Sequence, residues 1–225
     1  PEAAEDAYRK SLAIAVRLGN VAGQASTLVQ LGNLYDDELN RPEEAVAFYQ
    51  QAADKYVEIG DAANEGRARS NVAETLRKLA RFDEARHEIE GAVACLEALG
   101  HAGEPWRFLS VLASIETDAG NTAAAAEAQG KAIACYLAYR RDGGENHTNA
   151  GRLCLAVTQS LLAGDPAQAV SLLQQQLPRF EAAGFGGFIR ALQAIVAGSR
   201  DPSLAGAPDL DFGMAAEILF LIETL

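Results

Sequence analysis

The chain has 225 residues, of which 49% are hydrophobic and 7% aromatic, and its formal net charge is -12 at pH 7. This charge argues against a general nucleic-acid binder, which needs positive charge to displace counterions from phosphate. It also argues against docking on an anionic membrane surface, and no stretch approaches the roughly 18 apolar residues of a membrane span. The composition therefore predicts a helical protein without a nucleic-acid or membrane partner. The charge is compatible with a basic or neutral protein partner, and solubility alone would also explain it.

Apolar residues at helical spacing predict the elements in chain order. The first helix covers residues 1–18, and helix pairs follow at about 21–59, 62–99, 104–140 and 146–183. Pro42 and Pro166 suit the first helical turn, Asp165 is a candidate N-cap, and Gly60 falls where a helix must stop. After residue 184 we expect a short helix at 187–198, a loop at 199–209 and a last helix at 212–225.

The elements repeat along the chain. The segment at Pro1 matches Pro42 after a shift of 41, and further shifts of 40, 40 and 44 reach Phe82, Thr122 and Pro166. Repeats of this length are typical of helical solenoids. We expect an all-α, right-handed solenoid of antiparallel helix pairs over residues 1–183, with a half repeat at 1–20 and pairs at about 21–60, 61–100, 101–143 and 144–183. Residues 184–225 would form a capping segment, in which Met214, Ile218, Leu221, Ile222 and Leu225 make an apolar stripe.

Small and aromatic residues recur at fixed places within the pairs. The first set is Leu31-Gly32-x-x-Tyr35 followed by Ala45, Tyr49 and Ala52; the second is Val72-Ala73-x-x-Leu76 followed by Ala85, Ile89 and Ala92. This pattern resembles the tetratricopeptide repeat family, and it fades where Glu116 and Gln129 occupy apolar positions. The 40–44 spacing exceeds the family's usual 34 and resembles the long-helix subgroup of kinesin light chains and bacterial signalling ATPases. An array of the HEAT or armadillo type is the alternative fold.

The resemblance implies a peptide-binding site on the first helix of each pair, which lines the concave surface of such solenoids. Arg67 and Arg107, spaced by 40, would form a short cationic ladder there. A plain solvated helix face is the alternative interpretation. The matching positions, with those one turn further along, are Ser26, Gln30, Asn33, Asp37, Arg67, Asn71, Glu74, Lys78, Arg107 and Ser114.

Little in the chain predicts catalysis. The three histidines fall in different repeats without a second ligand at metal spacing. Cys95 and Cys135 share one repeat position and, with Cys154, are expected to be small apolar core residues rather than a disulfide or a metal site. Three cysteines in no metal-like spacing suggest a reducing compartment, by default the cytoplasm. We expect no catalytic residue, no metal site, no cofactor and no enzyme activity.

The sequence therefore predicts a protein-protein interaction scaffold that binds a peptide or protein in its concave groove. The chain starts at Pro1 and ends just after an apolar run, so we expect a fragment of a larger bacterial protein. The alternative function is a sensing arm of a multidomain signalling NTPase or protease-like effector. Homo-oligomerisation through the terminal helices is a further possibility.

Overall fold

A computed structural model describes the backbone of all 225 residues and the side chains of residues 1–96 and 99–225. Its regular elements are helical throughout this part of the chain, so the all-α prediction is confirmed. Three short turns interrupt the α-helices: the π-helical η1 (Leu34–Glu38) and the 3-10 helices η2 (Glu97–Gly103) and η3 (Pro202–Gly206). The α-helices are α1 (Glu2–Arg17), α2 (Val21–Asn33), α3 (Pro42–Ile59), α4 (Ala62–Lys78), α5 (Phe82–Leu96), α6 (Pro105–Asp118), α7 (Thr122–Arg141), α8 (Asn149–Leu162), α9 (Pro166–Ala182), α10 (Gly186–Val196) and α11 (Phe212–Thr224).

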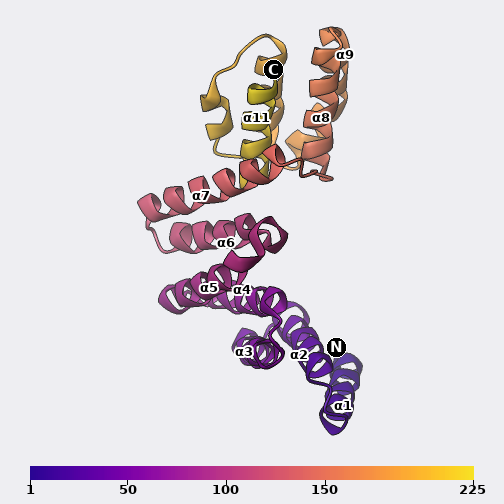
Figure 1. Ribbon diagram of the computed structural model, residues 1–225, viewed down its shortest axis with the longest axis vertical. Coiled ribbons are helices and arrows are strands. Elements are labelled where there is room, and N and C mark those ends of the chain that lie inside the picture. The colour runs from indigo at the N-terminus through magenta and orange to yellow at the C-terminus, as the bar shows by residue number, and fades with distance from the viewer. The chain divides into compact units, whose positions relative to one another are not determined.

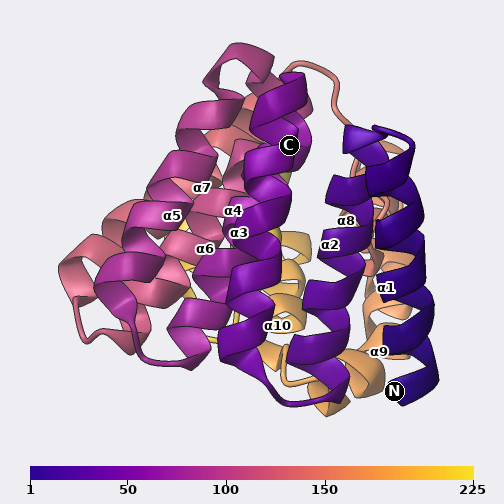
Figure 2. The same ribbon diagram turned by 90° about the horizontal axis from the view of Figure 1, so that it is seen from below.

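The chain folds as two compact units, an N-terminal unit of Pro1–Ala132 and a C-terminal unit of Ile133–Leu225. In the N-terminal unit, α2 packs against α3 and α4 against α5, as adjacent antiparallel pairs (Figure 1). Figure 2 shows α1 alongside α2. This succession of pairs is consistent with a tetratricopeptide-like solenoid. The division predicted after residue 183 rests on the repeat pattern and stays a prediction.

The ends of the helices follow local sequence chemistry. Pro42 and Pro166 are the first residues of α3 and α9, as predicted, where proline's missing N–H leaves no hydrogen bond unmade. The Asp165 carboxylate caps α9 by accepting a hydrogen bond from the backbone N–H of Gln168 at 3.0 Å. Gly60 ends α3 with φ of 69°, a left-handed conformation that costs other residues energy.

Small residues let the helices of the N-terminal unit approach closely. Ala45, Ala52, Ala73, Ala85 and Ala92 all have no exposed surface, and they surround larger buried side chains. Burying each of the larger side chains contributes about 1.5–3 kcal/mol. The packed core is drawn from Leu31, Tyr35, Val46, Tyr49, Val72, Leu76, Ile89, Leu96, Phe108 and Ile115.

The π-helical turn η1 explains an irregularity of the repeat. The stretch from the N-cap Asn20 to Pro42 is one residue longer than the stretch from the N-cap Asp61 to Phe82. A π-turn holds one residue more than an α-turn. The first shift of 41 and the second of 40 therefore reflect an extra residue taken up by Leu34–Glu38 at the end of α2.

The C-terminal unit has a separate core. There α11 packs against α8 and α10, and α9 packs against α8 and α10. The five residues of the predicted stripe, Met214, Ile218, Leu221, Ile222 and Leu225, all join this core. A buried carboxylate, that of Glu217, accepts hydrogen bonds from Tyr136 at 3.0 Å and from Asn146 at 2.9 Å. The helices of the described chain include none with the length and apolarity to cross a membrane.

Candidate partner-binding face

The ten predicted binding residues lie on the first helices of the N-terminal unit. Three are in α2, one in η1, four in α4 and two in α6. Eight of these side chains are exposed, while Asn33 and Asn71 are half-buried. We call this surface of α2, η1, α4 and α6 the first-helix face. Its residues come from three neighbouring helices, as a surface that contacts an elongated partner requires.

Ion pairs connect the first helices at their C-terminal ends. Lys78 Nζ of α4 lies 2.6 Å from Asp36 Oδ2 of η1, and Arg77 of α4 pairs with Asp118 of α6. Thr75 Oγ1 also lies 3.5 Å from this carboxylate, but its proton goes to the Asn71 carbonyl at 2.9 Å. Partly exposed pairs of this kind contribute about 0–1 kcal/mol each. They restrict how neighbouring helices turn against one another, so Lys78 has an intramolecular role.

Three members of these pairs, Asp36, Arg77 and Asp118, are not among the residues predicted from the sequence. Their charges are opposite, and the two pairs are separated by 42 and 41 residues, about one repeat. Opposite charges one repeat apart at the ends of the first helices are the signal that would have found them.

Asn33 is held by a buried tyrosine. The Tyr49 hydroxyl donates a hydrogen bond to Asn33 Oδ1 at 2.8 Å, and Tyr49 itself is 3% exposed. Burial, with the carboxylates of Asp36, Asp37 and Glu74, raises the pKa of Tyr49, so the hydroxyl stays protonated and remains a donor. The bond fixes the orientation of the Asn33 amide, whose NH2 group is turned away from Tyr49 and is available as a donor.

The two arginines of the expected cationic ladder differ in their surroundings. Arg107 Nε of α6 lies 3.0 Å from Oε2 of Glu104, the residue that precedes this helix, so a carboxylate offsets its charge. Arg67 donates a hydrogen bond of 3.2 Å to the neutral Asn64 side chain and has no carboxylate partner among the described side chains. Arg67 therefore keeps a free positive charge on this face.

Two acidic groups of the first-helix face also lack an ion-pair partner. Asp37 and Glu74 are exposed and make no ion pair with any described side chain. Both carboxylates contribute to the raised pKa of Tyr49, so each lies close enough to act on that hydroxyl. The first-helix face thus offers free carboxylates on η1 and α4, and Arg67 adds a cation in α4.

The described residues carry no arrangement typical of a metal or redox centre. Across residues 1–96 and 99–225, no three His, Cys, Asp or Glu side chains are grouped to hold a metal ion. Cys95, Cys135 and Cys154 are free thiols; the first two are half-buried and the third is buried. Burial raises the pKa of Cys154, which lowers the thiolate fraction that nucleophilic chemistry needs.

Comparison with known proteins agrees with the repeat geometry. A tetratricopeptide repeat family pattern matches residues 1–56, which cover α1, α2, η1 and most of α3. A search of curated proteins finds no match. The matched region contains Gly32 of α2 and Tyr49 of α3, whose ring lies against the Gly32 backbone. Residues 1–56 therefore resemble tetratricopeptide repeats in sequence, and the helix pairs beyond them keep a tetratricopeptide-like fold.

Proposed function

We propose that this chain is a protein-interaction scaffold and that its first-helix face binds an extended segment of a partner protein. The helical repeat and the tetratricopeptide match of residues 1–56 support a scaffold. One observation carries the choice of face: the ion pairs Asp36–Lys78 and Arg77–Asp118 join successive first helices, while neighbouring polar groups stay free. A site on supported helices costs less entropy to organise than one on loops.

The free groups suggest how a partner is recognised. Gln30 and the Asn33 amide would bond the backbone of the partner, because amides both donate and accept. Asp37 and Glu74 would attract a basic side chain, and Arg67 an acidic one, so the partner segment should carry both charges. If the chain is the sensing arm of a larger signalling protein, this face would receive the trigger.

Peptides selected from a random-peptide phage library on the wild-type chain provide a test. Their affinities for Arg67→Glu and Glu74→Lys are then measured by fluorescence polarisation. We expect at least one reversal to weaken binding about tenfold or more, equivalent to about 1.4 kcal/mol.

Lys131→Glu is the matched control, because Lys131 is an exposed cation of α7 that pairs, among the described side chains, only with Glu127 of its own helix. It should leave the affinity unchanged. Equal affinity of both face variants and wild type, with helicity retained in circular dichroism, would remove the first-helix face from consideration. Loss of binding in Lys131→Glu alone would place the site on the second helices instead.

A further inference from the structure

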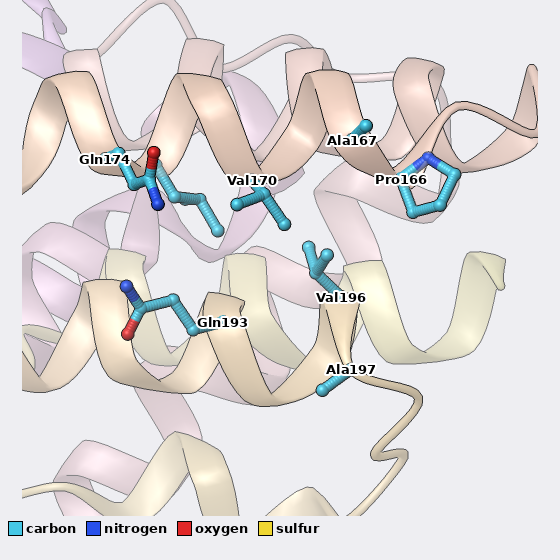
Figure 3. Close-up of a pocket in the computed structure, with 8 residues that line it drawn as sticks. Pro166, Ala167, Val170, Gln174, Gln193, Val196 and Ala197 are labelled. Carbon is cyan, nitrogen blue, oxygen red and sulfur yellow. The ribbon is translucent and has the colours of Figure 1, made fainter.

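A second candidate site lies in the C-terminal unit, between α9 and α10. The two helices run antiparallel and are held together at one end by the rings of Phe180 and Phe188, whose centroids are 5.4 Å apart. Toward the other end the two helices form the walls of a hollow of about 340 Å³ that is open to solvent (Figure 3). It is lined by Pro166, Ala167, Val170, Leu173, Gln174, Gln193, Val196 and Ala197.

The hollow has an apolar floor and two opposed amides. Leu173 is 1% exposed and fixed in the core, whereas Val170 is 43% exposed although it faces the hollow. Figure 3 shows the side chains of Gln174 and Gln193 projecting toward each other from opposite walls. Neither amide bonds to another described residue, and both are exposed. The two facing amides above the apolar floor can therefore form hydrogen bonds with polar atoms from outside the unit.

The lining selects the charge of an occupant. None of the eight lining residues carries a charge, in a chain where 22% of residues do. A charged side chain placed between Val170 and Val196 would lose hydration without gaining a partner. An aliphatic side chain would instead bury its surface against them, gaining about 25 cal/mol for each Å² removed from water.

The amides select the backbone conformation of an occupant. Each glutamine can donate and accept, which matches the alternating N–H and C=O groups of an extended chain. A helical partner would offer neither, because its backbone groups are already bonded to one another. We infer that the α9–α10 hollow docks an extended, uncharged segment of a partner protein, with one aliphatic side chain between Val170 and Val196 and its backbone bonded by Gln174 and Gln193.

The probe is a capped peptide with a central leucine between threonines, residues that favour an extended backbone. It is titrated into the full chain, and the side-chain amide signals of Gln174 and Gln193 are followed by NMR. We expect both amides and the Val170 and Val196 methyls to shift at about millimolar peptide. The same peptide with aspartate in place of leucine should cause no shift.

Variants assign the site. Val170→Lys and the double variant Gln174→Ala/Gln193→Ala should each weaken binding about tenfold. Leu162→Lys is the matched control, because Leu162 is a 65% exposed apolar residue of α8 outside the hollow. It should bind like the wild type. These substitutions are at exposed positions, and circular dichroism checks that each variant folds.

Three outcomes would overturn the inference. They are an absence of shifts at millimolar leucine peptide, equal binding of the aspartate peptide, and unchanged affinity of both hollow variants. Analytical ultracentrifugation of the peptide-free protein measures its oligomeric state and tests separately whether a second copy occupies the hollow. A dimer that Val170→Lys converts to monomer would show that a second copy fills it, and would replace the extended-segment proposal.

Discussion

The ring of Tyr49 lies against the backbone of Gly32: a Cβ atom built on Gly32 would stand 2.4 Å from Tyr49 Cε1. The ring therefore occupies the space that any larger residue at position 32 would need, and α2 and α3 approach closely there. At the matching positions of the next pair, Ala73 replaces the glycine and Ile89 replaces the tyrosine, and both lie in the same core. The larger residue on the first helix is thus accompanied by a smaller residue on the second. Glycine and tyrosine in the first pair are thus complementary choices.

Gly32→Ala should destabilise the chain although alanine favours helices. The added methyl group must displace a buried ring, and such overpacking costs about 1–3 kcal/mol. The gain in helix propensity, up to about 1 kcal/mol, offsets only part of this. The midpoint of urea unfolding, followed by circular dichroism, should fall.

Gly130→Ala is the control for the propensity gain, since nothing lies within 4 Å of a Cβ built on this glycine of α7. It should stabilise the chain by about 0.5–1 kcal/mol. The double variant Gly32→Ala/Tyr49→Ile copies the alanine and isoleucine of the next pair and should recover part of the loss. Equal gains from both single glycine variants would contradict the close approach.

The contact between Gly32 and Tyr49 could be predicted because it depends on residue size at a repeat position. The π-turn η1 could be predicted only in part. The shift of 41 in place of 40 reveals an extra residue, but a π-turn has no residue signature, and several places in the first unit could hold it. At Leu34–Glu38 the turn packs against α3, and that tertiary contact is not visible in the sequence of a single repeat.

The ion pairs of the first-helix face could not be predicted from the repeat pattern, because they depend on the reach of long side chains. Lys78 was assigned to partner binding by position alone, yet its long flexible side chain reaches Asp36 on the preceding repeat. Glu116 looked like a flaw in the repeat because it replaces a bulky apolar residue. Arg86 of α5 compensates its charge and Asn121 donates a hydrogen bond to it. Both contacts depend on how α5, α6 and the turn after α6 pack, which the repeat pattern does not give.

Tyr35→Phe should loosen α1. The Tyr35 hydroxyl donates to Glu5 Oε1 at 2.6 Å and accepts from Arg9 Nη2 at 2.8 Å, so it bonds both residues of α1 to η1. The bond from Tyr35, and after it a bond that Arg9 Nε donates to Glu5 Oε1 at 2.8 Å, lower the pKa of Glu5. The variant should raise that pKa toward its ordinary value in an NMR titration and speed amide exchange in α1.

Tyr56→Phe is the comparison for Tyr35, because the Tyr56 hydroxyl bonds to no described residue. It should leave both the Glu5 titration and the α1 exchange unchanged. If Tyr35→Phe behaved the same way, the hydroxyl would not be what holds α1 in place.

Glu116→Gln should reduce stability in a pH-dependent way. Arg86 donates to the buried Glu116 carboxylate at 2.5 and 3.1 Å and, as the largest influence, lowers the pKa of Glu116 below 4.5. The unfolded chain therefore binds this proton more readily, so the stabilisation is fully present above about pH 4.5 and is lost as the pH falls through the lowered value. The glutamine variant should be less stable by about 1–3 kcal/mol near neutral pH.

The difference in free energy of unfolding between Glu116→Gln and wild type should become smaller at acidic pH. Urea unfolding of both proteins at about pH 7 and about pH 3.5 measures it. Glu127→Gln removes an exposed pair with Lys131 and should change little at either pH. If the difference in unfolding free energy between wild type and Glu116→Gln stayed constant with pH, the charge of Glu116 would contribute nothing to stability.

Glu217→Leu should be among the most damaging changes in the C-terminal unit. The carboxylate of Glu217 is 1% exposed and accepts from Tyr136 and Asn146, while burial and this carboxylate raise the pKa of Tyr136 and keep its hydroxyl a donor. Arg140 Nε lies 3.0 Å from Glu217 Oε1, but its N–H is not aimed at that oxygen, so this contact is an ion pair without a hydrogen bond. Removing the carboxylate leaves the Arg140 charge buried and uncompensated.

The expected cost of Glu217→Leu is about 3–5 kcal/mol in urea unfolding. Replacing Arg140 as well, in Glu217→Leu/Arg140→Leu, removes the stranded charge and should recover much of that loss, because apolar pairs often substitute for buried ion pairs. Glu223→Leu is the control, since Glu223 pairs with Arg141 across the same two helices but is exposed. It should cost no more than about 1 kcal/mol. A double variant less stable than Glu217→Leu would show that Arg140 stabilises the unit through its stacking on the Phe220 ring, 4.8 Å from the guanidinium carbon, more than through the carboxylate.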